Sequence, residues 1–509
     1  MITENAIPLR FQTAEVGVDW LQCNIECQEG CPVNTNCRGY LMLAAEGRFE
    51  EGYILARDPN PVAAICGYVC SAPCEKACRR ADIDKPLAIR AMKRFLVDWH
   101  YGNNMPDNIV VAPRTGKSVA VIGAGPAGLS AAKELAGDGH EVHVYEALPS
   151  GGGTCLIGVP AFRLPRDVIE LDVNWVAKHG AEFHYNVEVG RDVTIDQLRE
   201  RHDAVVVSAG CMYPVAMNIP GEELDGVIYG VDFLKKANLG QEQWVGEHVV
   251  IVGGGYTAMD SSRTALRLGA KTSVVCYRRG PEEMVVDEEE QHETRFEGVR
   301  FELFSSPVEV LGDERGKVIG MVFQRVKLGP PDASGRRSPE PIPGSEFTIP
   351  CDMVIPCTSQ AADNNVLGEY GSKLNRHLGV TDTREILPGG SVSSWRTPPL
   401  NGTTPTGPDG KPYNALKFDL NRGLVVTNPD TFQTNVDGIF ACGDFVTGPA
   451  TIIEAAGRGR STARAVDRWL AGVRGDELEE LPVINRATVT QALEHDMPWA
   501  YDAIERQHI

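Results

Sequence analysis

The chain contains two apolar runs, each followed by a glycine-rich turn and then by a helical pattern of apolar positions. The first run, Ser118–Ile122, is unbroken, as in a strand that is buried on both faces of a parallel sheet. It leads into the turn Gly123-Ala-Gly125-Pro-Ala-Gly128 and a predicted helix over Leu129–Ala136. A second predicted strand, Glu141–Tyr145, ends in Glu146. This order predicts a βαβ unit of a doubly wound α/β fold.

The turn between these elements has the chemistry of a dinucleotide site. Gly123 and Gly125 let the backbone turn and approach a pyrophosphate, and Gly128 lets the helix pack closely on the strand. The amino end of the helix supplies a positive dipole for the phosphates. Glu146, at the end of the second strand, is placed to accept hydrogen bonds from a ribose. An ordinary tight turn would need all of these features to coincide, so we expect a nucleotide here.

The same pattern returns further along the chain. A strand from Val249 leads into Gly253-Gly-Gly255-Tyr256-Thr257-Ala258, a helix through Leu268 and a strand over Thr272–Tyr277. The position that corresponds to Glu146 is Cys276, and Arg278 and Arg279 follow it. A carboxylate there would prefer a free 2′-hydroxyl, whereas arginines bind a 2′-phosphate. This favours NADP(H) over NAD(H), the alternative being a solvated strand end.

Eight of the 14 cysteines fall in one short region near the amino terminus. They are Cys23, Cys27, Cys31, Cys37, Cys66, Cys70, Cys74 and Cys78. In a chain without a secretion signal, such density is typical of metal binding. Zinc usually takes Cys-x2-Cys pairs, which are absent, whereas a cysteine before proline, as at Cys31, is a habit of two-cluster ferredoxins. We therefore favour two [4Fe-4S] clusters over zinc or a structural thiol cluster. The six scattered cysteines are expected to be small buried hydrophobes.

Charge narrows the range of partners. The 69 acidic residues exceed the 49 basic ones and give a formal charge of -20, which argues against nucleic acid or an anionic membrane surface. The sequence has no apolar run of about 18 residues, so we expect no membrane span and a cytoplasmic location. The acidic run Asp287–Glu290 is interpreted as the solvated face of a helix.

Beyond these patterns, five stretches carry a resemblance to a known family. They are Val69-Cys-Ser-Ala-Pro-Cys-Glu75, Gly158-Val-Pro-Ala-Phe-Arg-Leu-Pro165, Gly254-Gly-Tyr-Thr-Ala-Met-Asp260, Tyr277-Arg-Arg279 and Gly443-Asp-Phe-Val-Thr-Gly-Pro-Ala-Thr451. Together they span roughly residues 20–470. The chain resembles the glutamate synthase small-subunit family, and also the large subunit of NADH-dependent ferredoxin:NADP oxidoreductase and the amino-terminal part of dihydropyrimidine dehydrogenase.

The resemblance implies FAD in the first nucleotide site and a reduced nicotinamide in the second. Asp444 and Thr451 would lie near the ribityl chain and the isoalloxazine. The further residues expected at the flavin are Ala127, Gly153, Thr154, Gly158, Ala209, Gly210, Gly443 and Ala450. Hydride would pass directly between nicotinamide and flavin, so no catalytic acid or base is expected.

The implied architecture has three domains. A helical domain with two [4Fe-4S] clusters would cover 1–112, and an FAD domain would be split over 113–240 and 365–475. The NAD(P) domain, 241–364, would be inserted between its halves, with a tail at 476–509. The Gly/Ser/Pro-rich stretch 387–413 is expected to be an exposed loop or a docking loop for a partner.

The ligand pattern departs from the family at two places. Trp20 stands where the family has its first cysteine, and Lys93 where it has an occasional carboxylate or amide ligand. Cys37 and Cys66 would replace these ligands. The expected partition places Cys23, Cys27, Cys37 and Cys78 on one cube and Cys31, Cys66, Cys70 and Cys74 on the other.

Three functions remain open from the sequence. The favoured one is an electron-transfer subunit that exchanges hydride between NAD(P)H and FAD. Its clusters would pass single electrons to or from a larger catalytic oxidoreductase subunit of the glutamate synthase, aldehyde or 2-oxoacid oxidoreductase type, or a ferredoxin-like carrier. The alternative is a free-standing NAD(P)H:acceptor reductase for ferredoxin or a disulfide, and a third is a nonenzymatic flavin-holding scaffold. The lack of a Cys-x2-Cys pair weakens the disulfide version.

Overall fold

A computed structural model describes residues 25–331, 335–362, 364–367, 418, 420–421 and 423–473. Contacts within the chain divide these residues into two units. The first unit contains residues 25–59 and Ala72–Pro106. The second contains Asn60–Ser71 and the described residues from Asp107 onward. Cys23, the stretch 387–413 and the tail 476–509 lie outside the described residues.

The first unit is helical. Its elements are α2 (Glu26–Glu29), α3 (Cys37–Ala45), α4 (Phe49–Arg57), α6 (Pro73–Lys76), the 3-10 turn η1 (Arg79–Asp82) and α7 (Ile89–Gly102). Aromatic side chains fill its core: Tyr40 and Tyr53 are buried, and the Tyr53 ring stacks on His100 with centroids 3.7 Å apart. The longest helix of this unit among the described residues is α7.

The second unit begins with a buried parallel sheet. Its strand order is β16-β4-β1-β2-β3, and all four pairings are parallel. The strands are β1 (Ser118–Ile122), β2 (Glu141–Glu146), β3 (Glu182–Tyr185), β4 (Ala204–Val207) and β16 (Ile439–Ala441). The central strand β1 is buried along almost its whole length, as its unbroken apolar run predicts.

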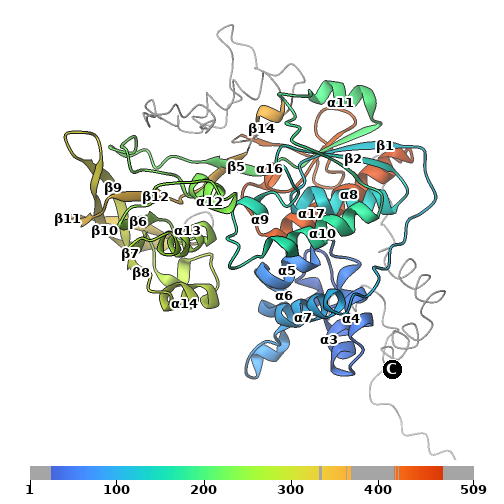
Figure 1. Ribbon diagram of the computed structural model, residues 1–509, viewed down its shortest axis with the longest axis horizontal. Helices are drawn as coiled ribbons and strands as arrows, with labels where there is room; N and C mark the ends of the chain where they lie inside the picture. The colour runs from blue at the N-terminus through green and yellow to red at the C-terminus, as the bar shows by residue number, and fades with distance from the viewer. Residues whose placement is uncertain are drawn as a thin grey trace, which may run out of the picture. The chain divides into compact units, whose positions relative to one another are not determined.

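Helices cover this sheet (Figure 1). They are α8 (Pro126–Gly137), α10 (Arg166–Lys178), α11 (Ile195–Arg201) and α17 (Ile452–Leu470), with the short turns α9 (Thr154–Ile157) and α16 (Asp444–Thr447). The helices α8 and α17 approach very closely, because a Cβ on Gly459 would lie 2.0 Å from the carbonyl oxygen of Ala127. Helix α5 (Ala63–Val69) packs against α10.

A second parallel sheet has the order β12-β6-β7-β8. Its strands are β6 (His248–Val252), β7 (Thr272–Tyr277), β8 (Arg300–Leu303) and β12 (Met353–Pro356). The helices beside it are α12 (Gly230–Asn238), α13 (Tyr256–Arg267) and α14 (Glu288–Phe296), after the turn η2 (Pro281–Glu283). An antiparallel sheet follows, with β9 (Ser305–Gly312), β10 (Val318–Pro331) and β11 (Arg337–Pro350).

The chain returns to the first sheet after this segment. Strand β5 (Cys211–Pro214) precedes the second sheet, and β13 (Gln360–Ala362) follows it and pairs with β5. The turn η3 (Asn364–Leu367), the ribbon β14 (Leu420–Asn421) and β15 (Leu424–Val425), and β16 come next. The second nucleotide-binding domain is therefore inserted in the first, which confirms the predicted α/β fold class. Among the described residues, no helix is both long and apolar enough to cross a membrane.

Candidate functional site

A cavity of about 1150 Å³ opens at the carboxyl ends of the two parallel sheets. Its walls include most of the residues predicted for the two nucleotides. From the first domain these are Gly123, Gly125, Ala127, Glu146, Gly153, Thr154, Gly158, Ala209, Gly210, Asp444, Ala450 and Thr451, and from the second Gly253, Gly255, Tyr256, Thr257, Arg278 and Arg279. Three predicted residues, Gly128, Ala258 and Gly443, do not line it. One cavity thus joins the two predicted sites.

The first glycine-rich turn needs its glycines for two different reasons. Gly123 has φ +97°, and a Cβ there would lie 2.6 Å from the carbonyl oxygen of Ser208. A Cβ on Gly128 would lie 1.9 Å from the carbonyl oxygen of Gly123, so this glycine lets α8 pack on β1. Gly443 behaves like Gly123, with φ +65°. Gly128 and Gly443 therefore shape the wall without facing the cavity.

Glu146 is held rigidly at the end of β2. Its two carboxylate oxygens accept hydrogen bonds from the backbone N–H groups of Ala124 at 2.7 Å and Leu148 at 2.8 Å. The side chain is buried, and burial raises the pKa of the carboxyl against these two hydrogen bonds, which lower it. Each oxygen keeps a further lone pair. Glu146 can therefore accept a ribose hydroxyl in the orientation that the backbone fixes.

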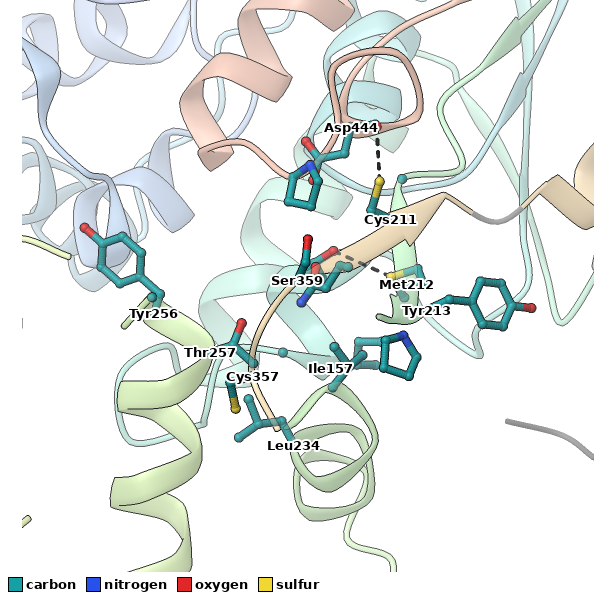
Figure 2. A pocket seen from close by; sticks show the side chains of 18 of the residues that line it. Ile157, Cys211, Met212, Tyr213, Leu234, Tyr256, Thr257, Cys357, Ser359 and Asp444 are labelled. Carbon is teal, nitrogen blue, oxygen red and sulfur yellow. Dashed lines mark hydrogen bonds between the residues drawn. The ribbon is translucent and has the colours of Figure 1, made fainter. Parts of the chain in front are cut away.

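Asp444, at the start of α16, also lines the cavity (Figure 2). Its Oδ1 is buried and has no hydrogen-bond partner among the described residues. Burial raises the pKa of this carboxyl to about 7, although a backbone hydrogen bond from Ala450 lowers it. Such an atom is costly unless a ligand supplies a donor. A polyhydroxylated ligand chain in the cavity would supply that donor.

Thr451 is the N-cap residue of α17. Its hydroxyl caps α17 through Glu454, whose carboxylate in turn accepts from the Thr451 backbone N–H at 2.9 Å. This capping box directs the amino end of α17 to the cavity, which both residues line.

The second glycine-rich turn has a similarly tight construction. Gly253 has φ +154°, and a Cβ on Gly254 would lie 2.6 Å from the ring of Tyr277. Figure 2 shows Tyr256 and Thr257 of α13 beside the pocket that Asp444 also lines. The Tyr256 hydroxyl donates to Asp287 at 2.8 Å. Ala258 is buried in the core of the second domain instead.

The two predicted arginines differ in their surroundings. Arg278 is exposed just beyond β7, whereas the Arg279 side chain is buried and donates from Nε to the carbonyl oxygen of Arg337 at 2.7 Å. Both line the cavity, and so does Arg336, which sequence reasoning missed. Arg336 precedes β11, nearly 60 residues from Arg278, so no local pattern connects them.

One predicted surface is only partly correct. In the acidic run expected to be solvated, Glu288 and Glu289 are exposed, whereas Glu290 is buried and forms ion pairs with Arg163 and Arg263. Asp287 caps α14 by accepting from the Glu290 backbone N–H at 2.9 Å. The acidic run therefore faces partly inward, because two arginines that are distant in sequence neutralise it.

Three of the clustered cysteines meet in the first unit. The Cys37 thiol lies in hydrogen-bonding range of both Cys27 and Cys74. The contact with Cys27 lowers the pKa of Cys37, while the contact with Cys74 and burial raise it to about 12. Cys31, Cys37 and Cys74 all lie close enough to the Tyr40 hydroxyl to disfavour its ionisation. A group of buried thiols without histidine has the donor chemistry of an iron–sulfur site.

Cys66 and Cys70 belong to the second unit, on α5 and at its end. The buried carboxylate of Asp172 on α10 fixes this helix by accepting from the backbone N–H groups of Ala64 at 3.1 Å and Ile65 at 2.9 Å. Val69 and Ser71, the neighbours of Cys70, line the nucleotide cavity. The cysteine-bearing segment and the cavity are therefore adjacent.

Comparison with known proteins agrees with this geometry. Residues 117–384 match the pyridine nucleotide-disulphide oxidoreductase family, and residues 14–105 match the dihydropyrimidine dehydrogenase domain II family with its 4Fe-4S cluster. The chain is 35% identical over 491 residues to the NADPH-Fe(3+) oxidoreductase subunit beta of Geobacter sulfurreducens, covering 95% of this chain and 69% of that protein. It is 34% identical to the glutamate synthase [NADPH] small chain of Azospirillum brasilense, covering 88% and 87%.

These matches extend over both glycine-rich turns and the cysteine-rich segment. The chain belongs to the glutamate synthase small-chain family of oxidoreductases. Among solved structures, Mycobacterium tuberculosis FprA in complex with NADPH has the same fold, with a TM-score of 0.51, 21% identity, and coverage of 76% of this chain and 91% of that one.

As a member of this family, the chain is an FAD-dependent NAD(P)H oxidoreductase with a helical 4Fe-4S domain. The first domain is hereafter the flavin domain and the inserted one the nicotinamide domain. Glu146 and the orphaned oxygen of Asp444 fit the ribose and the ribityl chain of FAD. Five of the six scattered cysteines are buried, as expected, and Cys357 is half-buried at the cavity wall.

Proposed function

We propose that this chain is the electron-transfer subunit of a larger oxidoreductase, using NADP(H), FAD and two [4Fe-4S] clusters. The observation that carries the proposal is the position of α5. Val69 and Ser71 line the cavity predicted for the flavin, and Cys70 lies between them in sequence. A cluster bound at Cys70 would adjoin the flavin, which supports transfer of electrons from one to the other.

The residues of the chain support this transfer by holding the two ligands in position. Bound FAD would supply the redox chemistry that links the hydride of a reduced nicotinamide to single electrons. The glycine-rich turns, Glu146 and Asp444 would orient the two ligands, and no acid or base is required. Asp172 anchors the amino end of α5. The segment that carries Cys70 beside the cavity is therefore fixed by its hydrogen bonds to α10.

Arginines support the preference for NADP(H). Arg278, Arg279 and Arg336 line the cavity. The strand register places Cys276 opposite Val252, as Tyr145 is opposite Ile122, so the last residue of the strand, Glu146 in the flavin domain, is Tyr277 here and not Cys276. A 2′-phosphate would find cations at this place and no carboxylate at the strand end.

The contacts among the thiols support a change in the expected partition. Cys37 lies in hydrogen-bonding range of Cys74 as well as of Cys27, so we propose that the Cys37 and Cys74 thiols bind the same cube.

A partner subunit completes the proposed function. The relatives named above are a subunit beta and a small chain of larger enzymes. We therefore propose that the clusters exchange electrons with a larger catalytic chain or a ferredoxin-like carrier. A free-standing acceptor reductase is the alternative, and purification of the native protein with or without a stoichiometric larger chain distinguishes the two.

The central test is anaerobic reduction of the purified protein by NADPH. Flavin bleaching and the EPR signal of reduced clusters are followed in the wild type and in Cys70→Ser. We expect the variant to keep one extractable FAD per chain and to keep reduction of that flavin by NADPH. It should lose the EPR signal of one cluster and the reduction of a cytochrome added as the electron acceptor. Cys351→Ser, a buried cysteine away from the cavity, is the matched control and should behave as the wild type. Full cluster reduction in Cys70→Ser would exclude the proposed path.

A further inference from the structure

Three side chains on β2 and β3 form a group that the redox chemistry does not use. His143 lies on β2, and Glu182 and His184 lie on β3. The register pairs His143 with Glu182 and Tyr145 with His184, so the three side chains share one face of the sheet. Glu182 begins β3, and the nucleotide cavity lies beyond the opposite, carboxyl ends of these strands. None of the three residues lines that cavity.

The distances within this group match a triangle of metal ligands. His143 Nδ1 lies 3.0 Å from His184 Nε2, and the two nitrogens lie 3.7 and 3.6 Å from the oxygens of Glu182. One ligand atom from each residue fits within 4.8 Å of the others. Tetrahedral zinc, with bonds of about 2.0–2.2 Å to nitrogen and oxygen, separates its ligand atoms by roughly 3.3–3.5 Å. A small rotation of each imidazole would therefore turn both nitrogens to one ion.

The residues around these three side chains make contacts that are typical of the second coordination sphere of a metal site. His143 Nε2 lies 3.0 Å from the Glu141 carboxylate, which can hold the ring in the tautomer that leaves Nδ1 free of its proton. The ring of Tyr145 stacks on His184 at 4.8 Å. Two carboxylates beside two imidazoles give the group a charge that suits a divalent cation. Paired strands hold the donors in place before any ion arrives.

Solvent reaches the group directly. The side chain of Glu182 is 64% exposed, that of His184 30% and that of His143 17%. An ion can therefore enter from water, and a water molecule can occupy the fourth position. The neighbouring His202 lies outside this set, because its two ring nitrogens face the hydroxyls of Ser118 at 2.7 Å and Tyr145 at 3.1 Å.

We propose that His143, Glu182 and His184 bind one divalent transition-metal ion, with Zn²⁺ as the best-suited probe. The ion would clip β2 to β3 at the edge of the flavin domain. Imidazole and carboxylate donors select zinc-like ions over Ca²⁺ or Mg²⁺, which prefer oxygen alone. The competing explanation is a pair of histidines joined by one shared proton, with no ion.

The test uses the holoprotein with its flavin and clusters in place. After treatment with EDTA, equilibrium dialysis against micromolar Zn²⁺ is followed by measurement of zinc and iron per chain. We expect one zinc per chain more in the wild type than in His184→Gln or Glu182→Gln, at equal iron content. Glu141→Gln should weaken Zn²⁺ binding about 10–100-fold through loss of its hold on His143. Zn²⁺ should also raise the Tm of the wild type but not of His184→Gln.

The control is His248→Gln, which removes an exposed histidine of β6 in the nicotinamide domain and should leave zinc uptake unchanged. Equal iron content in all variants shows that the clustered thiols are not the source of the difference. No extra zinc in the wild type, or equal zinc in the wild type and His184→Gln, would overturn the proposal in favour of the proton-sharing pair.

Discussion

Arg163 and Asp260 join the flavin and nicotinamide domains at the wall of their common cavity. Nη1 of Arg163, between α9 and α10, donates to both carboxylate oxygens of Asp260 on α13 at 2.7 and 2.9 Å. Nη2 of Arg163 lies 2.9 Å from Glu290 on α14. Burial raises the pKa of Asp260 to about 6, although Arg163 lowers it. Each buried charge therefore depends on its partner, and the pair fixes one arrangement of the two domains.

The first prediction is that Arg163→Gln lowers the free energy of unfolding by about 3 kcal/mol, because it leaves the buried Asp260 carboxylate without its ion-pair partner. Flavin reduction by NADPH in single turnover should slow as well, since the domains lose their fixed arrangement. Asp260→Asn added to Arg163→Gln should restore part of the stability, because it removes the uncompensated charge.

Arg267→Gln provides the matched control for this pair. Arg267 makes an exposed ion pair with Glu297 and stacks on Phe162 within the same network. Its loss should cost no more than about 1 kcal/mol and leave hydride transfer unchanged. Equal losses of stability for Arg163→Gln and Arg267→Gln would show that the buried pair has no special role.

The second prediction concerns the pH dependence of FAD binding. Burial raises the pKa of Asp444 to about 7, so without FAD this carboxyl is protonated at lower pH. A ribityl hydroxyl that donates to the carboxylate favours the ionised form, so the bound pKa is lower than the free one. FAD affinity should therefore rise with pH up to about 7 and then level off, as fluorescence titration of the apoprotein would show.

The variant Asp444→Asn separates this effect from others. It should weaken FAD binding at pH 8 by about 1.5–3 kcal/mol and abolish the rise with pH. Asp437→Asn, at an exposed position, should keep both the affinity and the pH dependence. An unchanged pH profile in Asp444→Asn would assign the titration to another group.

The third prediction separates the arginines of the nicotinamide site. Arg278→Gln should weaken NADPH by about 1.5–3 kcal/mol and leave NADH nearly unchanged, because a 2′-phosphate exists only in NADPH. Arg279→Gln should affect both coenzymes, since the side chain also holds the Arg337 carbonyl oxygen. Steady-state KM values for both coenzymes measure this, with Arg300→Gln on β8 as an exposed control. Equal losses with NADPH and NADH in Arg278→Gln would remove it as the discriminator.

The fourth prediction concerns cluster ligands. Cys37→Ala and Cys74→Ala should abolish the same reduced-cluster EPR signal, because the two thiols lie in hydrogen-bonding range of each other. Cys66→Ala should lower the iron content if Cys66 is a ligand. FAD content and diaphorase activity with an artificial acceptor should stay nearly intact in all three. About eight irons per chain in Cys66→Ala, with an unchanged spectrum, would make Cys66 a packed thiol.

Local chemistry explains what the sequence predicted well. The turn at Gly123–Gly128 and the carboxylate of Glu146 lie within one βαβ unit, where spacing alone determines which atoms meet. The pair Arg163–Asp260 and the arginine Arg336 come from elements of different domains or sheets, so only the folded arrangement brings them to one cavity. The burial of Glu290 was not predicted for the same reason, since it depends on ion pairs with Arg163 and Arg263.

The contacts that the sequence did not predict depend on strand register and on helix docking. Nothing in the sequence shows that His143 and His184 are neighbours, because their contact depends on the pairing of β2 with β3 across α10. Likewise, the adjacency of Cys70 to the cavity depends on the docking of α5 against α10. Pairings of this kind are tertiary choices that no short pattern records.

The pairing of β16 with β4 also determines the order in which the two domains can fold and bind their cofactors. These strands lie more than 200 residues apart in the sequence, with the nicotinamide domain between them. The inserted domain is continuous from β6 to β12 and can fold as it leaves the ribosome, whereas the flavin sheet waits for Ile439–Ala441 and α17. Asp444 and Thr451 follow β16 directly, so the flavin pocket closes only at this late step. Loading of FAD therefore comes after the nicotinamide domain has been synthesised, and an apoprotein stalled earlier would expose the unpaired edge of β4.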